Sequence, residues 1–198
     1  MLKENEMSRL FKLSTAGEYG SIAPSTGEEL GQLLAKLGHE VVNDHAANPN
    51  AKVAYWGDTV AQLFYMAADA YEAGAAVTIG HNRSDQYLQA ANQHRKMADE
   101  LCNQARIQRD AERSASLMIA FQDGYEGLKG DRYAFESRKA FQLGQYYAEA
   151  ELEMPETIKY EWVQGRDGGD RFNIDGHRYT VEYPEGKTNL PEVKLLDN

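Results

Sequence analysis

The segment 84–121 contains neither glycine nor proline, and this feature most restricts how the chain can fold. Its composition is dominated by Ala, Gln, Arg, Glu and Leu, which favour the helical state, so we expect one long helix. Apolar and small residues recur at a spacing of three or four, which places them on one face of that helix. The residues expected on this buried face are Tyr87, Ala91, His94, Ala98, Leu101, Ala105, Ala115 and Ile119.

Shorter helical patterns precede and follow the long helix. One begins at the capping pair Ser25-Thr26 and ends before Asn48-Pro49, because a residue that precedes proline avoids the α region. The next covers about residues 58–73 and is expected to stop at Gly74, while residues 75–80 fit either a short strand or a further helical turn. A short helix over residues 4–13 and a last helix over about residues 133–151 complete the set.

After Pro155 the apolar period changes from helical to alternating. Ile158, Tyr160 and Trp162 alternate with charged residues, which predicts a strand with one buried face. Asp175-Gly176 then separates two alternating runs and predicts a two-residue type I′ hairpin, since both central residues must accept positive φ. Such a turn pairs Ile174 with His177 and Phe172 with Tyr179, so that one face carries Phe172, Ile174, Tyr179, Val181 and Tyr183. The tail from Pro184 is polar, and part of it is expected to be disordered.

These patterns predict an α+β fold with a predominantly helical body and a C-terminal antiparallel β-meander or hairpin. The body should contain four to five helices, one of them long. We divide the chain into an N-terminal arm over residues 1–24, a helical domain over 25–154, and a small β subdomain with a polar tail over 155–198.

Charge restricts the classes of partner. The net charge of -10 disfavours direct binding to nucleic acid, whose phosphates attract basic proteins. No apolar stretch approaches the ~20 residues that span a bilayer, so no membrane partner is expected, and the first residues are too polar for a signal peptide. With Cys102 as the only cysteine there is no internal disulfide, which fits a cytoplasmic location, the host cytoplasm if a phage encodes the chain.

The acidic residues are concentrated before the β end, where residues 149–170 hold 7 acidic and 2 basic side chains. We expect this segment to bind a host protein or complex with a basic surface, through Glu149, Glu151, Glu153, Glu156, Glu161, Asp167 and Asp170. A second candidate interface is the arginine stripe of the long helix, formed by Arg95, Arg106, Arg109 and Arg113. The stripe is either a solvated face with intrahelical ion pairs or a docking surface for an acidic partner, a second copy included.

No catalytic residue, cofactor or metal site is predicted. His39 and His45 are six positions apart, which on a helix sets them about 120° apart instead of on one face. The string Glu28-Glu29-x-x-Gln32 with Glu40 and Asp44 resembles the all-helical nucleoside triphosphate pyrophosphohydrolases, which hold magnesium with carboxylates from two helices. The chain departs from that family at Gln32, where a further acid is expected, and in its longer Glu-to-Asp spacing.

Residues 120–148, with Gly124, Tyr125, Gly144 and Tyr147 among them, resemble the Gly-Tyr helical hairpin of ribosome modulation factor and of small phage and prophage proteins. The resemblance implies close helix approach at glycines, with Phe121, Tyr125, Phe141 and Tyr147 interlocking. Thr78-Ile-Gly-His-Asn82 is similar to a string common in phage proteins.

The leading hypothesis is therefore a non-enzymatic acidic protein-binding module. The phage resemblance implies an inhibitor of a host defence or nucleic-acid-handling complex, similar to an anti-CRISPR protein or a nucleic-acid mimic. The alternatives are a magnesium-dependent pyrophosphohydrolase and a structural homo-oligomer, for example a homodimer joined through the long helix.

Overall fold

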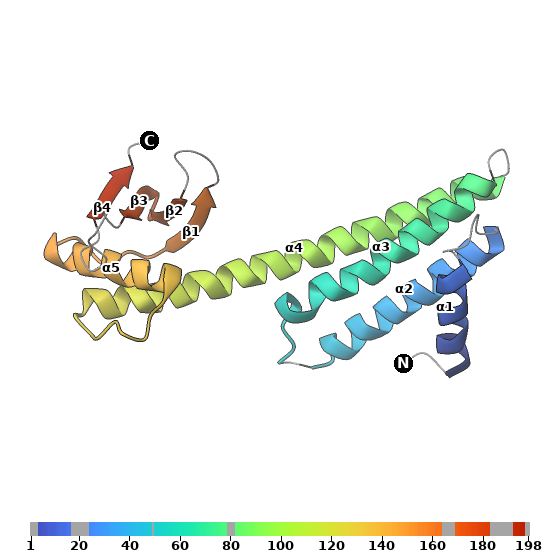
Figure 1. Ribbon diagram of the computed structural model, residues 1–198, viewed down its shortest axis with the longest axis horizontal. Coiled ribbons are helices and arrows are strands. Elements are labelled where there is room, and N and C mark those ends of the chain that lie inside the picture. The colour runs from blue at the N-terminus through green and yellow to red at the C-terminus, as the bar shows by residue number, and fades with distance from the viewer. Residues whose placement is uncertain are drawn as a thin grey trace. The chain divides into compact units, whose positions relative to one another are not determined.

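The computed structural model of the protein describes residues 4–16, 24–48, 50–78, 82–163, 169–182 and 192–196 (Figure 1). Its helices are α1 (Glu4–Ala16), α2 (Pro24–Ala46), α3 (Val53–Val77), α4 (Asn82–Tyr125) and α5 (Phe135–Glu149), and its strands are β1 (Ile158–Val163), β2 (Gly169–Ile174), β3 (His177–Glu182) and β4 (Glu192–Leu196). The predicted α+β fold is thus confirmed, with α4 as its long helix. None of the described helices is long and apolar enough to cross a membrane.

The chain forms two compact units, Met1–Arg109 and Asp110–Asn198, and the division falls within α4. It differs from the boundary that the sequence analysis set at residue 154. The reason is that the last part of α4 and the whole of α5 share their core with the strands and not with α2 and α3.

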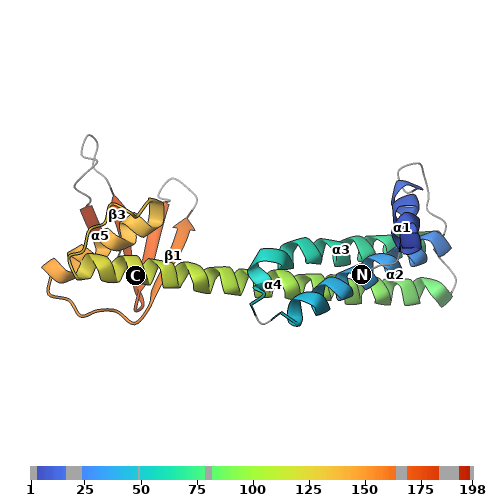
Figure 2. The same cartoon turned by 90° about the horizontal axis from the view of Figure 1, so that it is seen from below.

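The first unit is a helical bundle in which α2, α3 and the first part of α4 lie side by side (Figures 1 and 2). Phe64 of α3 is fully buried and packs with Ala98 and Leu101 of α4. The predicted stop at Gly74 is wrong, since α3 continues to Val77 and the start of segment 75–80 is helical. Gly74 lies where α2 approaches α3 closely: a Cβ on Gly27 of α2 would lie 3.1 Å from the Gly74 nitrogen.

The predicted N-terminal arm contains α1, which packs on α2. Leu10 lies against the apolar cluster that includes Leu30 and Leu34. Two ion pairs join the helices, Arg9 to Glu29 at 2.7 Å and Lys36 to Glu6 at 2.6 Å.

The second unit is an antiparallel sheet in the order β1-β2-β3-β4, with α5 and the end of α4 against one face (Figure 2). The predicted hairpin register is confirmed, with Phe172 opposite Tyr179 and Ile174 opposite His177. Asp175 and Gly176 have φ of 48° and 91°, as a type I′ turn requires. The predicted inner face is buried at Phe172, Ile174, Tyr179 and Val181, whereas Tyr183 lies outside the described residues.

Two sequence expectations in this unit are wrong. Ala115 and Ile119 are exposed, and α4 instead buries Leu117, Ala120 and Phe121, because this part of the helix packs on a different core from its first part. Trp162 is 62% exposed, since it lies at the far end of an edge strand, past the core. Part of the polar tail forms β4, which pairs with β3 through Val181 and Val193.

Close packing of α4 on α5 depends on two glycines. A Cβ on Gly124 would lie 1.9 Å from the Phe141 carbonyl oxygen, and one on Gly144 would lie 2.0 Å from that of Phe121. Aromatic side chains interlock around them: the ring centroids of Phe121 and Tyr147 are 5.0 Å apart, and the ring planes meet at 75°, an edge-to-face arrangement. This contact brings the two helices onto the inner face of the sheet.

Candidate functional site

The segment between α5 and β1 carries most of the predicted binding residues. We call residues 149–161 the acidic segment. Its glutamates are Glu149, Glu151, Glu153, Glu156 and Glu161, and all five side chains are exposed. The cluster predicted from charge is therefore present at the surface of the second unit.

The backbone of the acidic segment is fixed at both ends. The Leu152 nitrogen donates to the Tyr147 carbonyl at 2.9 Å, and the Tyr125 hydroxyl donates to the Leu152 carbonyl at 3.0 Å. Further on, the backbone N–H groups of Glu156 and Thr157 donate to the Asp175 carboxylate at 3.0 and 2.8 Å, which lowers the pKa of Asp175. The exposed glutamates are thus carried by an ordered segment, and their spacing is set by the fold.

Unlike several other carboxylates of the unit, the five glutamates of the acidic segment have no partner among the described residues. Asp123, Glu136, Asp170 and Glu182 each contact a basic side chain. Within the described part of the chain, none of the five glutamates makes an ion pair, and none accepts a hydrogen bond through its side chain. Their charge is therefore available to an external partner.

Apolar side chains are exposed within and beside the acidic segment. Leu152 is 37% exposed and lies between two glutamates, Met154 is 38% exposed and lies between Glu153 and Pro155, and Trp162 follows Glu161 directly. Apolar and aromatic anchors inside a charged rim are typical of protein-binding surfaces and are not needed for solubility.

Two residues predicted with this cluster stand apart from it. Asp167 lies outside the described residues. Asp170 is half-buried and accepts hydrogen bonds from the Lys139 ammonium and the Tyr160 hydroxyl. Burial acts to raise the pKa of Asp170, but the two donors outweigh it and the pKa is lowered. Burial and the Asp170 carboxylate raise the pKa of Tyr160 to about 12. Asp170 therefore joins α5 to the sheet.

The arginine stripe is engaged in contacts within each unit. In the first unit, Arg95 binds Asp69 and Glu72 of α3 at 2.9 and 2.8 Å, and Arg109 binds Asp58 at 2.5 Å. Arg106 donates to Asn103 one turn away. In the second unit, Arg113 pairs with Glu136 at 2.8 Å and lies 4.2 Å over the Tyr160 ring. Most of these contacts join α4 to another element, so the stripe is neither a row of intrahelical pairs nor a set of unpaired cations.

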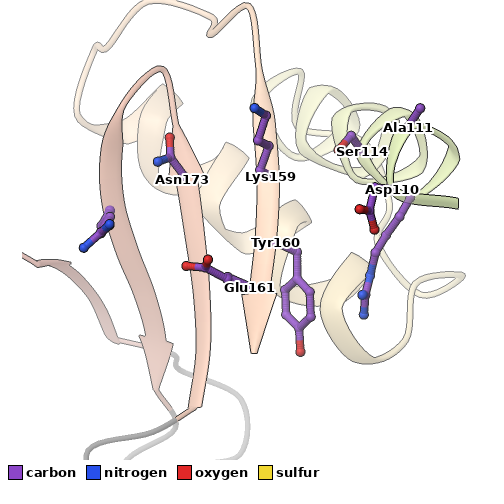
Figure 3. Close-up of a pocket in the computed structure, with 9 residues that line it drawn as sticks. Asp110, Ala111, Ser114, Lys159, Tyr160, Glu161 and Asn173 are labelled. Carbon is purple, nitrogen blue, oxygen red and sulfur yellow. The ribbon is translucent and has the colours of Figure 1, made fainter. Parts of the chain in front are cut away.

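Next to the acidic segment, β1 and α4 enclose a hollow of about 760 Å³ (Figure 3). We call it the edge groove. Figure 3 shows Asp110, Ala111 and Ser114 on α4, opposite Lys159, Tyr160 and Glu161 on β1. Its lining residues are Asp110, Ala111, Arg113, Ser114, Lys159, Tyr160, Glu161, Asn173 and Arg178. A smaller hollow of about 300 Å³ shares Ser114 and Lys159 with it and reaches Met118 and Glu156.

The carboxylates of the pyrophosphohydrolase-like string are used in separate contacts. Glu28 accepts a hydrogen bond from the Tyr87 hydroxyl at 2.8 Å, whereas Glu29 pairs with Arg9. In the described ranges, no group of three or more His, Cys, Asp or Glu side chains is placed to hold a metal ion. His39 lies against the Phe64 ring at 5.1 Å, and His45 stacks on Trp56 at 4.7 Å.

Comparison with known proteins adds no assignment: no family model, no curated protein and no solved structure matches this chain. The site must be interpreted from its own geometry. The sequence analysis missed Asp110, Ala111 and Ser114 of the edge groove, because nothing local distinguishes these residues from other polar and small positions of a helix. It also missed Lys139, whose partner Asp170 is 31 positions away.

Proposed function

We propose that the chain is a non-enzymatic acidic protein-binding module whose acidic segment docks on a basic surface of a partner protein. The observation that supports this most directly is the set of five exposed glutamates on an ordered backbone, none of which has a partner in the described part of the chain. An ordered acidic surface loses little conformational entropy on binding, and its field steers association with a basic partner.

The partner class that fits this chemistry is a nucleic-acid-handling protein. Such proteins line their channels with Lys and Arg, and regularly placed carboxylates can occupy the sites of phosphates. Leu152 and Met154 would add apolar contacts that a nucleic acid does not make. The phage-like strings of the sequence extend the proposal to an inhibitor of a host defence or nucleic-acid-handling complex.

Charge reversal of the acidic segment tests the proposal. The variant Glu151→Lys, Glu153→Lys, Glu156→Lys should lower affinity for the captured partner by about tenfold or more, which corresponds to ~1.4 kcal/mol. Wild-type affinity should also fall steeply between low and physiological salt, because exposed charges are screened. Affinity is measured by surface plasmon resonance across a salt series, with the partner captured from host lysate.

The matched control reverses three exposed carboxylates elsewhere. Asp44→Lys, Glu100→Lys, Asp131→Lys changes the net charge by the same amount at positions outside the acidic segment. Equal losses in the two triple variants would mean that only total charge matters. Binding that resists both salt and the segment reversal would refute the proposal.

A further inference from the structure

The strand β1 lies at one edge of the sheet, and part of its backbone has no hydrogen-bond partner among the described residues. In a two-residue hairpin the residues that flank the turn exchange both hydrogen bonds, so the backbone of Ile174 faces β3 and that of Asn173 faces β1. The Asp175 nitrogen donates to the Thr157 carbonyl at 3.3 Å, so the residue two positions before Lys159 also bonds towards β2, as this alternation requires. Lys159 and Glu161, which oppose Asn173 and Arg171, therefore bond to β2.

By the same alternation, the N–H and C=O groups of Ile158, Tyr160 and Trp162 point away from β2. No hydrogen bond to these groups is found among the residues that the structure describes. A row of unpaired backbone donors and acceptors on an edge strand is a template for another strand.

The edge groove provides space for such a strand. It lies between α4 and β1 and reaches Asn173 of β2 and Arg178 of β3, and the small side chains of Ala111 and Ser114 on α4 line it (Figure 3). Neighbouring strands lie about 4.8 Å apart, so an added strand would lie over this part of α4. The smaller hollow extends the same space along the start of β1, past Ala115 and Met118.

Charges along this edge select the occupant. Asp110, Glu156 and Glu161 are exposed carboxylates without an ion-pair partner in the described residues. The exposed cations that face them are Lys159 and Arg178, whereas Arg113 is paired with Glu136. The edge therefore carries an excess of negative charge, which the rest of the acidic segment extends. We propose that the partner inserts an extended, basic segment into the edge groove and adds it to β1 as a fifth strand. This inference rests on the proposed function and specifies how the partner is held.

A designed peptide serves as the probe. In Lys-Lys-Val-Glu-Val-Lys-Lys, the central Glu can lie opposite Lys159, the two Val opposite Ile158 and Tyr160, and a Lys opposite Glu161. The Val N–H groups then donate to β1, whereas the Glu N–H points away. N-methylation of one Val should weaken binding by about tenfold or more relative to N-methylation of the Glu, because only the former removes a donor to β1.

The protein side is tested at Trp162. Proline at this position removes only an outward N–H, and edge strands tolerate proline there. Trp162→Pro should bind the peptide about tenfold less tightly than Trp162→Ala, which lacks the same side chain but keeps the donor. Peptide binding should also slow hydrogen exchange of the Ile158, Tyr160 and Trp162 amides in the wild type. Isothermal titration and amide exchange by NMR provide these measurements.

The outcomes separate the two proposals. If both N-methyl peptides bind equally and Trp162→Pro equals Trp162→Ala, strand addition is overturned. In that case, weaker peptide binding by the Glu151, Glu153, Glu156 reversal would still support the acidic docking surface, and unchanged binding would contradict it too. The free protein could also sediment as a dimer that is lost in Trp162→Pro but kept in Trp162→Ala. That result would show that a second copy occupies the edge of β1, and it would overturn the proposal of a partner segment.

Discussion

The Asp170 carboxylate accepts hydrogen bonds from Lys139 of α5 and Tyr160 of β1. The Thr180 hydroxyl of β3 donates to the backbone carbonyl of Asp170 at 3.1 Å. Asp170→Asn removes the charge that Lys139 faces in a half-buried site. Hydrogen bonds to charged groups contribute about 1.5–3 kcal/mol, so we expect a loss of stability within that range, measured by urea unfolding at pH 7.

The pH dependence of that loss has a definite sign. Because the pKa of Asp170 is lowered in the folded protein, its contribution to stability is present above the unfolded pKa near 3.8 and disappears as pH falls through the folded pKa. The difference in unfolding free energy between wild type and Asp170→Asn should therefore shrink below about pH 4. Glu182→Gln is the control, since Lys194 and Glu182 are 51% and 53% exposed, and their pair contributes at most about 1 kcal/mol.

At the scale of elements, the contact between α4 and α5 sets the inner face of the second unit. Gly144→Ala would place a methyl group 2.0 Å from the Phe121 carbonyl oxygen, a backbone atom that cannot move without the whole helix. Overpacking of this kind costs about 1–3 kcal/mol or more, and we expect a lower midpoint of thermal unfolding, monitored by circular dichroism. The neighbouring Gln145 is exposed, so Gln145→Ala should change stability by no more than about 0.5 kcal/mol. A Gly144→Ala variant as stable as wild type would mean that α5 does not pack at this distance.

Elements determined by local sequence could be predicted, and those determined by distant contacts could not. The Asp175-Gly176 turn fixes its own register, and the absence of Gly and Pro predicts α4 without reference to the rest of the chain. By contrast, the burial of Leu117 in place of Ala115 depends on which core this part of α4 meets. Gly74 has the sequence properties of a helix stop, but α3 continues past it to Val77, and its backbone lies where Gly27 of α2 approaches closely.

The candidate site likewise has features that the local sequence predicts and features that depend on distant contacts. Exposure of the acidic segment could be predicted from local charge, because a run of glutamates is costly to bury. The pairing of Arg95 with Glu72 and of Lys139 with Asp170 depends on tertiary packing that no spacing in the sequence encodes. For the same reason the edge groove, which α4 and β1 form together, could not be found before the fold was known.

At the scale of the whole molecule, α4 contributes to two separate cores. Its buried residues end at Ala105 in the first unit and resume at Leu117 in the second, and no residue between them is buried. A helical stretch of this length with no buried residue is held mainly by exposed ion pairs and is marginally stable in water, so it should transmit little cooperativity. We therefore expect the two units to unfold in separate transitions.

The two tryptophans allow each transition to be followed, since Trp56 lies in the first unit and Trp162 in the second. Phe64 is fully buried in the first core and Phe172 in the second, and Phe→Ala at such sites costs about 3–5 kcal/mol. In a Trp162→Phe background, Phe64→Ala should shift the fluorescence transition of Trp56 to lower urea, whereas Phe172→Ala should not. In a Trp56→Phe background the effects should be exchanged, because each substitution leaves a cavity in only one core. If either substitution shifted both reporters equally, α4 would couple the units into one cooperative structure, and a partner bound at the acidic segment would then also stabilise the helical bundle.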